Sequence, residues 1–338
     1  MANWYLQNGK NSDVVISTRV RLARNIKNLN FESKCKKEDK KQILSKIESI
    51  VPSLGYGLQL LKLKDMDDLT KISLVEKHVI SPEFLNKADE SSAILINNEE
   101  NICIMINEAD HIRMQVFAEG MAIEELMNLA IEIDQELEKL LDYAYSEKYG
   151  YLTACPTDVG TGLKLSVMVH LPGLEETGNL NKVLHIVNNF GMSIKVVYGE
   201  GNQSMGNIYQ ISNNQTLGIS EQEIMKNMKI ITEKVIEQER IARKYLGKNQ
   251  ERFADKVYRS FGILANARIL SSNECIDLLS DVKLGTDMGV IRELDDMKVK
   301  KLFLYTKSAN LQKYYGKVMN SNERDLKRTE IIRQIITQ

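Results

Sequence analysis

Two hydrophobic patterns follow one another along the 338 residues of the chain. Up to about residue 220, short apolar runs alternate with helical segments. Runs of roughly four to eight β-branched or aliphatic residues are typical of strands. They predict strands over residues 14–18, 93–96, 102–106, 165–169 and 193–197. The segment 97–101 (N-N-E-E-N) consists of turn-forming and acidic residues, so we expect it to join the second and third strands in a hairpin.

Helical periodicity is strongest in the later part of the chain. In the first part it predicts one long amphipathic helix over residues 122–145. Ser220 and Glu223 form a capping-box signature, which predicts that another helix begins there and ends near Gly247. Further helices are predicted over residues 252–269, 274–282, 296–305 and 323–336.

The change of pattern divides the chain into two parts. We expect an α+β catalytic domain over residues 1–220 and a helical C-terminal domain over residues 221–338. The sheet edges and turns of the first part are where we expect the chemistry.

Composition excludes several classes of function. A net charge of −1 gives no electrostatic argument for binding nucleic acid or an anionic membrane. The four cysteines form no C-x-x-C pair, so neither a zinc site nor a disulfide framework is indicated. The N-terminal residues lack the pattern of a signal peptide, and no apolar run approaches the roughly 20 residues of a membrane helix. We expect a cytoplasmic protein without a metal site of its own.

The segment 17–21 (S-T-R-V-R) is the first that could carry chemistry. On a strand, Ser17, Arg19 and Arg21 point to the same side. Two guanidinium groups on one face suit a polyphosphate, because each can form charge-assisted, bidentate bonds to phosphate oxygens. Taken alone, the pattern is more often that of a solvated strand face.

Three further polar segments follow in the first part of the chain. They are residues 107–113 (N-E-A-D-H-I-R), residues 155–172 (C-P-T-D-V-G-T-G-L-K-L-S-V-M-V-H-L-P), and residues 198–201 (Y-G-E-G) with 206–213. In the longest segment, the G-T-G turn leads into a predicted strand that would place Lys164, Ser166, Met168 and His170 on one face.

Together and in this order, the four segments resemble the phosphagen kinases, and the long C-P-T-x-x-G-T-G-L segment is the most specific of them. The resemblance covers residues from about 3 to 215. It implies an antiparallel sheet flanked by helices, the phosphagen-kinase-like catalytic domain. Metabolite-directed members carry a helical domain ahead of S-x-R-x-R, for which this chain has no room. With its helical C-terminal part, the chain is similar instead to the bacterial protein arginine kinases, which transfer the γ-phosphate of ATP to arginine side chains of proteins.

The resemblance also implies site residues. Glu200 and Glu108 correspond to carboxylates that grip the guanidinium and serve as general base, and Cys155 corresponds to the cysteine beside that guanidinium. For Cys155, a small buried hydrophobe is the alternative reading. The residues implied to contact the nucleotide are Ser17, Thr18, Arg19, Val20, Arg21, His78, Arg113, Lys164, Leu165, Ser166, Val167, Met168, Lys195, Val196, Val197, Tyr198, Gly199 and Glu200.

Three positions depart from the family pattern. The family reads N-E-E-D-H, and its second glutamate is the catalytic carboxylate, whereas this chain has Ala109. If the segment is extended, residue 109 faces the site and Glu108 points away from it. Lys164 and Lys195 replace two arginines that contact phosphate, which keeps the charge and loses the bidentate fork.

Near the C-terminus, the segment Arg324, Asp325, Leu326, Lys327, Arg328 and Thr329 resembles the R-D-x-x-R-A motif of protein arginine kinases, with Thr329 in place of the alanine. In those enzymes the motif forms a phosphoarginine-binding allosteric pocket. An ordinary charged helix face is the alternative explanation.

The resemblance implies ATP as phosphoryl donor, with Mg²⁺ bound through the nucleotide. The implied partners are protein substrates with exposed arginines, a zinc-binding activator protein and an AAA+ protease in a stress response, and a second copy of the chain in a homodimer. Three alternatives remain open: a pseudokinase scaffold that binds ATP or phosphoarginine, a kinase for free arginine, and a non-enzymatic helical adaptor.

Overall fold

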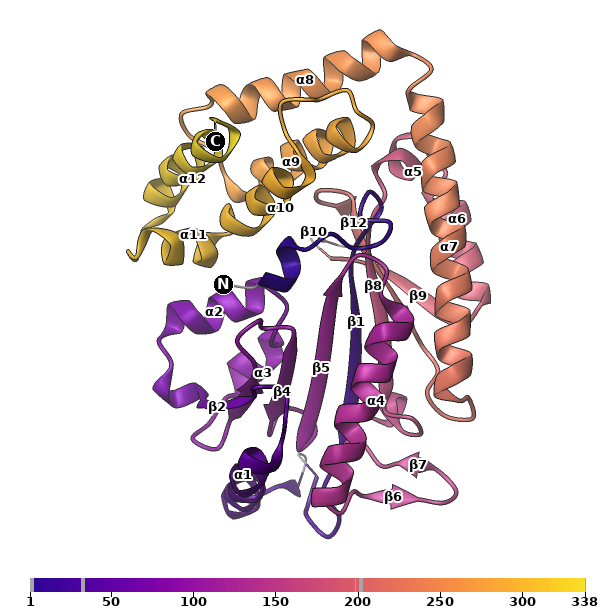
Figure 1. Ribbon diagram of the computed structural model, residues 1–338, viewed down its shortest axis with the longest axis vertical. Coiled ribbons are helices and arrows are strands. Elements are labelled where there is room, and N and C mark those ends of the chain that lie inside the picture. The colour runs from indigo at the N-terminus through magenta and orange to yellow at the C-terminus, as the bar shows by residue number, and fades with distance from the viewer. Residues whose placement is uncertain (1–2, 32–33, 198, 201–202, 338) are drawn as a thin grey trace.

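The computed structural model describes residues 3–31, 34–197, 199–200 and 203–337. Its larger part is built on one antiparallel sheet of eight strands, in the order β2-β3-β4-β5-β1-β8-β12-β9 (Figure 1). The predicted antiparallel sheet flanked by helices is therefore confirmed. Its strands are β1 (Val15–Arg24), β2 (Gln59–Lys62), β3 (Ala93–Ile96), β4 (Ile102–Ile106), β5 (Ile112–Glu119), β8 (Leu163–His170), β9 (Met192–Val196) and β12 (Ile208–Asn213). Two short hairpins lie outside it, β6 (Tyr145–Ser146) with β7 (Gly150–Tyr151) and β10 (Gly199–Glu200) with β11 (Gln203–Ser204).

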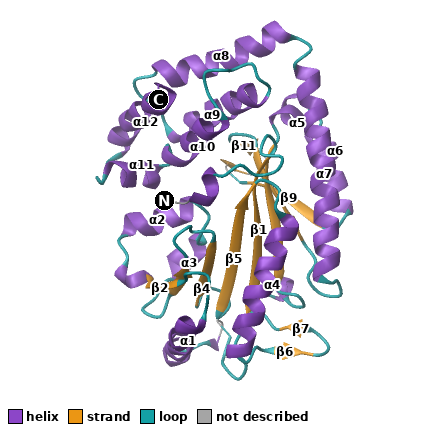
Figure 2. Cartoon of the chain, viewed as in Figure 1, coloured by secondary structure: helices purple, strands orange, loops and turns teal. Residues whose placement is uncertain are grey.

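Helices cover one face of this sheet (Figures 1 and 2). The long helices α4 (Ile123–Leu140) and α7 (Glu221–Leu246), together with α6 (Leu180–Asn189), pack on it. Alternate residues of the central strands point into this layer, for example Val20, Leu165 and Ile211, and all are buried there. The intervening residues point to the opposite face, which carries the polar segments.

The other helices of the first part pack around the sheet on both of its faces. They are α1 (Lys37–Ile50), α2 (Asp68–Glu76), α3 (Pro82–Lys87) and α5 (Pro172–Glu176), with 3-10 turns at Asn3–Leu6 (η1), Val51–Ser53, Leu63–Asp65 and Pro156–Asp158. A smaller core between α2, α3 and the sheet contains Trp4, Phe84 and Phe117. Among the described residues, no helix has the length and hydrophobicity needed to cross a membrane.

In the part of the C-terminal region that the structure describes, five helices enclose a hydrophobic core that also includes Ile208 of β12. They are α8 (Gln250–Asn266), α9 (Ser272–Asp287), α10 (Asp296–Tyr305), α11 (Ser308–Tyr315) and α12 (Ser321–Thr337). The apolar face of α7 belongs to the core of the sheet. A chain truncated near Gly247 would therefore keep α7 and preserve that core. A chain truncated at the predicted boundary, residue 220, would lose α7 from it.

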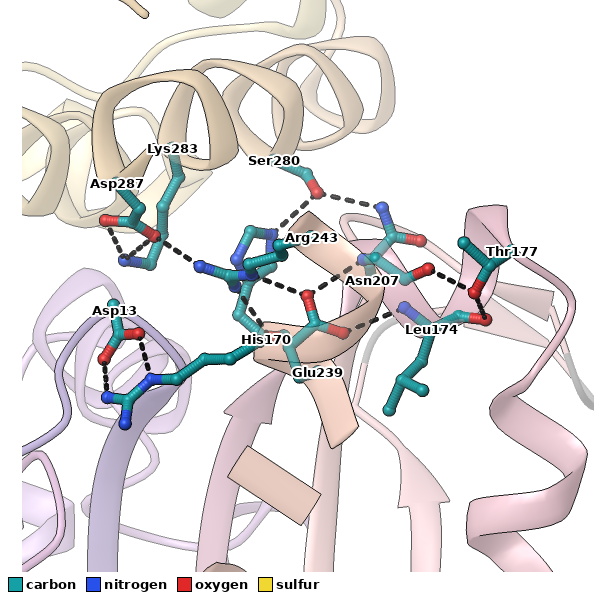
Figure 3. Close-up of polar contacts among 12 residues, drawn as sticks. Asp13, His170, Leu174, Thr177, Asn207, Glu239, Arg243, Ser280, Lys283 and Asp287 are labelled. Atoms are coloured by element: carbon teal, nitrogen blue, oxygen red, sulfur yellow. Dashed lines mark hydrogen bonds and ion pairs between the residues drawn. The ribbon is translucent and has the colours of Figure 1, made fainter. Parts of the chain in front are cut away.

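A buried ionic network joins the two parts where β8 ends (Figure 3). The carboxylate of Glu239 on α7 accepts hydrogen bonds from the backbone N–H groups of Gly173 and Leu174, both at 2.9 Å. Arg243 donates to Glu239 at 2.7 Å and to Asp287 of α9 at 3.3 Å. From the same end of β8, His170 contacts Ser280 of α9 at 2.8 Å. The last residue of a site strand is thus fixed to the C-terminal domain.

Several predicted boundaries were wrong. The helix predicted over residues 122–145 ends at Leu140, because residues beyond it pair with the chain near Ile26 and then form β6. β1 extends to Arg24, well past the predicted end at residue 18, since its two outward-facing arginines interrupt the apolar run without ending the strand. The helix predicted over residues 252–269 begins earlier, where Asn249 accepts a bond from the N–H of Arg252, and ends at Asn266.

Candidate active site

Positively charged side chains line the face of the sheet opposite α4, α6 and α7. On β1, Arg19 and Arg21 point to this face, and Arg21 lies directly opposite Lys164 of β8. Arg113 of β5 and Lys195 of β9 belong to the same face. The residues next to each of them along its strand point to the opposite face, into the helical layer. Five predicted nucleotide contacts on four strands are thereby brought together.

The environment of the arginines opposes their charge. Burial, followed by the charge of Arg113, lowers the pKa of Arg19 to about 10. Burial and then the charges of Arg113 and Arg19 lower the pKa of Arg21 to about 9. Arginine nevertheless stays protonated at neutral pH. Holding the positive charges this close together therefore costs electrostatic free energy. An anion lying between them would offset that cost.

Lys164 and Arg19 are held by neutral partners. The ammonium group of Lys164 donates to the backbone oxygen of Asn213, and burial lowers its pKa, with further contributions from the neighbouring cations. Arg19 donates to the side-chain oxygen of Gln210 at 3.2 Å and reaches Ser166 at 3.5 Å. These partners orient the two cations and leave their charge uncompensated.

Glu108 points into the site, and the prediction that it points away was wrong. Residues 107–111 form a turn between β4 and β5, in which Asn107 has a left-handed conformation with φ of 59°. The side chain of Glu108 is buried and accepts bonds from Arg113 at 2.5 Å and from Ser81 at 2.8 Å. Although burial opposes ionisation, the charge of Arg113 and these hydrogen bonds keep the pKa of Glu108 below its usual value. Glu108 is therefore an ionised carboxylate that positions Arg113.

The other predicted catalytic carboxylate is only partly described. Glu200 lies in the short strand β10, which pairs with β11 next to the site sheet, but its side chain, like those of residues 198–203 generally, is outside what the structure describes. Tyr198 lies outside the described residues altogether. Ala109 occupies the turn beside Glu108, and its N–H donates to the Glu108 carboxylate at 2.7 Å.

Two glycines shape the loop that carries Cys155. Gly160 and Gly162 have φ of 112° and 63°, and a Cβ atom would lie 2.2 Å from the Thr216 backbone oxygen at Gly160 and 2.7 Å from the Ala23 backbone oxygen at Gly162. Only glycine allows both the conformation and the close approach. The G-T-G turn of the motif is thus required by the backbone packing that begins β8.

The side chain of Cys155 is exposed, so the alternative that it is a small buried hydrophobe was wrong. Its Sγ lies 3.0 Å from the hydroxyl of Thr157. The loop is anchored by Asp110, whose carboxylate accepts bonds from the Ala154 N–H at 2.6 Å and from Asn25 at 2.7 Å. Cys155 is therefore accessible and held in place by the N-E-A-D-H turn.

The sequence analysis did not single out Asp158. This carboxylate belongs to the same loop, and its negative charge raises the pKa values of both Arg21 and Lys164 against the effect of burial. Asp158 is thus an acidic group whose charge acts on both of these cations. The sequence does show an aspartate within the C-P-T-D segment. Its position after a cysteine-proline turn gave no indication that its charge acts on cations of the strands.

Some residues that were predicted to contact the nucleotide have side chains that point away from the site. The side chains of Thr18, Val20, Leu165 and Val167 point into the helix-covered side of the sheet. Val196 packs against that same core, whereas Val197 packs against the C-terminal core. If these residues contact a nucleotide, they do so through the backbone. Ser17, Ser166 and Met168 face the site as predicted.

His78 lies beyond α2 in a left-handed conformation, with φ of 61°. Non-glycine residues adopt this conformation at a cost, and it is found preferentially at functional sites. Burial and the nearby charges of Lys307 and Arg19 lower the pKa of His78 well below its usual value, so its ring is neutral. It lines one pocket together with Arg19, Ser17 and Met168.

The C-terminal motif lies on α12. Arg328 is almost completely buried and donates to the backbone oxygen atoms of Thr306 and Leu270, as well as to Asp325. Arg324 donates to the Met319 backbone oxygen at 2.9 Å. The remaining residues of the motif are Leu326, which is exposed, Lys327, which pairs with Glu330, and Thr329, whose hydroxyl bonds to backbone oxygens. The motif is more than a solvated charged face, because Arg328 ties three segments together.

Among the described residues, no three or more histidine, cysteine or acidic side chains are grouped so that they could hold a metal ion.

Comparisons with known proteins match both parts of the chain. Residues 41–242 match the family described as ATP:guanido phosphotransferase, C-terminal catalytic domain, and residues 250–338 match the protein-arginine kinase McsB C-terminal domain. The chain is 44% identical to a protein-arginine kinase from Halothermothrix orenii, over 98% of this chain and 96% of the relative. It is 40% identical to one from Bacillus subtilis, over 99% and 93%.

Solved structures are similar in fold. A lombricine kinase superposes with a TM-score of 0.60 at 23% identity, covering 71% of this chain and 70% of the other. The substrate-free duplicated taurocyamine kinase from Schistosoma mansoni gives 0.61 at 23% identity, covering 80% of this chain and 40% of the other.

Proposed function

The chain belongs to the ATP:guanido phosphotransferases and, among them, to the protein-arginine kinases, and from this membership and the geometry of its site we propose that it transfers the γ-phosphate of ATP to arginine side chains of proteins. The observation that carries the proposal is the row of cations on the sheet face opposite α4, α6 and α7. Arg19, Arg21, Arg113, Lys164 and Lys195 together match the charge of a triphosphate. The predicted use of ATP follows from the same family membership.

The cations do the electrostatic part of the catalysis. Phosphoryl transfer depends on neutralising the phosphate charge and on holding donor and acceptor in line. The arginines of β1 and β5 are fixed by neighbouring strands and by Glu108, so the site is organised before the nucleotide binds. Mg²⁺ bound through the nucleotide would supply further positive charge.

The acceptor guanidinium must be oriented and must lose a proton. Cys155 is accessible at the edge of the site, and a thiolate there would pair with the guanidinium. Glu200 is the proposed base, and Asp158 is a second carboxylate beside the cations. Glu108 is assigned a positioning role, because its carboxylate is already bonded to Arg113 and Ser81.

We propose further that the segment 324–329 binds phosphoarginine as an allosteric pocket. Arg328 stabilises the segment from within, while Arg324 and Lys327 remain accessible from outside. A cytoplasmic role in marking stress-response proteins for an AAA+ protease, a zinc-binding activator and a homodimer are the remaining proposals, and they rest on the resemblance alone.

A catalytically weakened pseudokinase is the second candidate, and Ala109 favours it. The turn at residues 107–111 places residue 109 next to Glu108, where a second glutamate would extend from the same turn as the group that holds Arg113. In this candidate the cation row still binds ATP, and the transfer step is slow.

The substrate class is tested by competition. The purified chain receives Mg-ATP with equal concentrations of arginine residues as casein and as free arginine, and phosphoarginine is measured separately in the protein and the small-molecule fractions. The proposal predicts phosphoarginine mainly in casein. Phosphorylation mainly of free arginine would contradict it and favour a metabolite kinase.

A further inference from the structure

A groove lies between the β6–β7 hairpin, the end of α4 and the segment that leads into α7, at the end of the molecule remote from the C-terminal domain (Figure 1). Its volume is about 470 Å³. We call it the hairpin groove, and its lining includes Glu138, Tyr145, Tyr149, Gly160, Leu217 and Glu221. None of these residues belongs to the cation row, so the groove is separate from the nucleotide site proposed above.

The groove shares a loop with Cys155. Tyr151 of the hairpin donates its N–H to the backbone oxygen of Gly160 at 2.8 Å and accepts the N–H of Gly160 at 3.2 Å. Thr216, which also lines the groove, donates its hydroxyl to the backbone oxygen of Thr157 at 2.8 Å. Because Gly160 follows Cys155 by five residues, their Cα atoms lie no more than about 18 Å apart. About five extended residues of a bound protein can therefore reach from Cys155 to the groove.

The tyrosine rings of the groove already contact cations. The guanidinium of Arg24 lies 3.6 Å from the centroid of the Tyr151 ring, and the ammonium group of Lys148 lies 5.1 Å from that of Tyr149. Both distances are typical of cation–π contacts. Tyr145 packs against the edge of Tyr151 and is 57% exposed, and among the described residues no cation lies over its ring. Its ring is therefore available to a cation of a partner.

Two carboxylates of the groove have no cationic partner among the described residues. Glu138 accepts a bond from the hydroxyl of Tyr151 at 3.3 Å, and neither Glu138 nor Glu221 forms an ion pair with a described side chain. Lys148 supplies one positive charge to the lining, so the negative charges outnumber it. Leu217 adds exposed apolar surface. The groove is thus complementary to a side chain with an aliphatic stem and a cationic end.

We infer that the hairpin groove binds a second basic side chain of the protein substrate, a lysine or arginine within about five residues of the arginine that is phosphorylated. The inference rests on the proposed protein-arginine kinase activity and adds a preference for basic sequences to it. Glu138 and Tyr145 are the residues assigned to this contact. Free arginine has no neighbouring residue and cannot make it, so the groove favours proteins over free arginine.

Two synthetic peptides test the inference with the full-length chain and Mg-ATP. Each contains a single arginine as acceptor. In the first, lysines lie on both sides within five positions of the arginine, because lysine adds charge without adding an acceptor. In the second, norleucine replaces each lysine and keeps the aliphatic stem. Phosphoarginine is measured by mass spectrometry under non-acidic conditions. We expect the KM of the lysine peptide to be about three- to tenfold lower, with similar kcat values.

Variants of the groove show whether it causes this difference. Glu138→Gln and Tyr145→Leu should each remove most of the difference in KM and leave the kinetics of the norleucine peptide unchanged. Tyr145→Phe keeps the ring and should keep the difference. The matched control is Glu125→Gln, which removes the same charge from an exposed position of α4, about 20 Å along the helix from Glu138. It should leave the difference intact.

The outcomes separate this inference from the proposed function. Equal KM values for the two peptides, or a difference that both Glu138→Gln and Tyr145→Leu leave intact, would overturn the groove assignment, while phosphoarginine in the peptides would uphold the kinase. Absence of phosphoarginine from both peptides and from casein would overturn both.

A second measurement needs no variant. A lysine peptide without arginine should inhibit the phosphorylation of casein in competition with casein, and its norleucine counterpart should not. Equal inhibition by the two peptides would contradict the inference.

Discussion

At the scale of single residues, Glu108 and Arg113 form the central ion pair of the site. The pair is largely buried, and the carboxylate is also held by Ser81 and by the N–H of Ala109. A buried carboxylate with this many donors holds a fixed position, so it can orient Arg113 toward a phosphate. The same bonds reduce its availability as a base.

Glu108→Gln should therefore impair nucleotide binding more than the chemical step. The amide keeps the shape and loses the charge that orients Arg113. Hydrogen bonds to charged groups contribute about 1.5–3 kcal/mol, so we expect the KM for ATP to rise roughly ten- to a hundredfold. Steady-state kinetics with casein measures it. A fall in kcat with an unchanged KM for ATP would instead identify Glu108 as the base.

The sequence alone predicted the strand face that carries Arg19, Arg21, Lys164 and Ser166, because alternation along a strand determines which side chains share a side. It failed at Glu108, since alternation does not hold where Asn107 turns the chain. It also missed Asp158, whose relation to the cations depends on how a loop folds back over the sheet. Contacts of that kind are set by tertiary packing and have no local pattern.

At the scale of elements, the junction of α7, β8 and α9 holds the two domains together. Glu239, Arg243, Asp287 and Lys283 are all buried there, and each has at least one partner of opposite charge. Burial raises the pKa of Asp287, against the lowering effect of Lys283 and Arg243. The network is therefore stable only while every charge in it is paired.

Arg243→Met should destabilise the protein strongly, because it leaves Glu239 buried without a cationic partner. Breaking such a pair typically costs about 3–5 kcal/mol. Arg240→Met is the matched control on the same helix, since Arg240 pairs with Asp13 at a partly exposed position, where the expected loss is about 0–1 kcal/mol. Urea denaturation measures both. Equal losses for the two variants would show that the buried network does not hold the domains together.

Elements with a strong local signal were predicted well. The helix predicted over residues 296–305 and the strands at residues 93–96 and 102–106 have the predicted bounds, and the Ser220 capping box begins α7. The short helix α11 was missed, because its eight residues offer little periodicity and its N-terminus is capped by Glu76 from another domain. Lys307, the N-cap residue of that helix, lines the same pocket as His78.

At the scale of the whole molecule, three of its four histidines link folding to pH. Burial lowers the pKa values of His78, His111 and His170, with neighbouring cations adding to the effect at His78 and His170. In the unfolded chain they would titrate near about 6.5. Below that pH the unfolded chain binds protons that the folded protein does not.

The stability provided by these neutral histidines should thus be complete above about pH 6.5 and be lost as the pH falls below it, by up to about 1.4 kcal/mol per pH unit for each histidine. Urea denaturation between pH 7.5 and about 5.5 measures the slope. His170→Asn should reduce the slope relative to the unaltered protein. A free energy of unfolding that stays constant across this range would contradict the assignment of neutral, buried rings.

The central claim is that this molecule phosphorylates protein arginines with Ala109 in place of the family glutamate. The most direct test incubates the unaltered chain and an Ala109→Glu variant with Mg-ATP and casein, and detects phosphoarginine by mass spectrometry under non-acidic conditions, which preserve the P–N bond. We predict phosphoarginine from the unaltered chain and a faster reaction from the variant, by up to roughly 10²–10⁴-fold if residue 109 supplies a general base. Phosphoarginine from the variant and none from the unaltered chain would contradict the account and identify the natural protein as a pseudokinase.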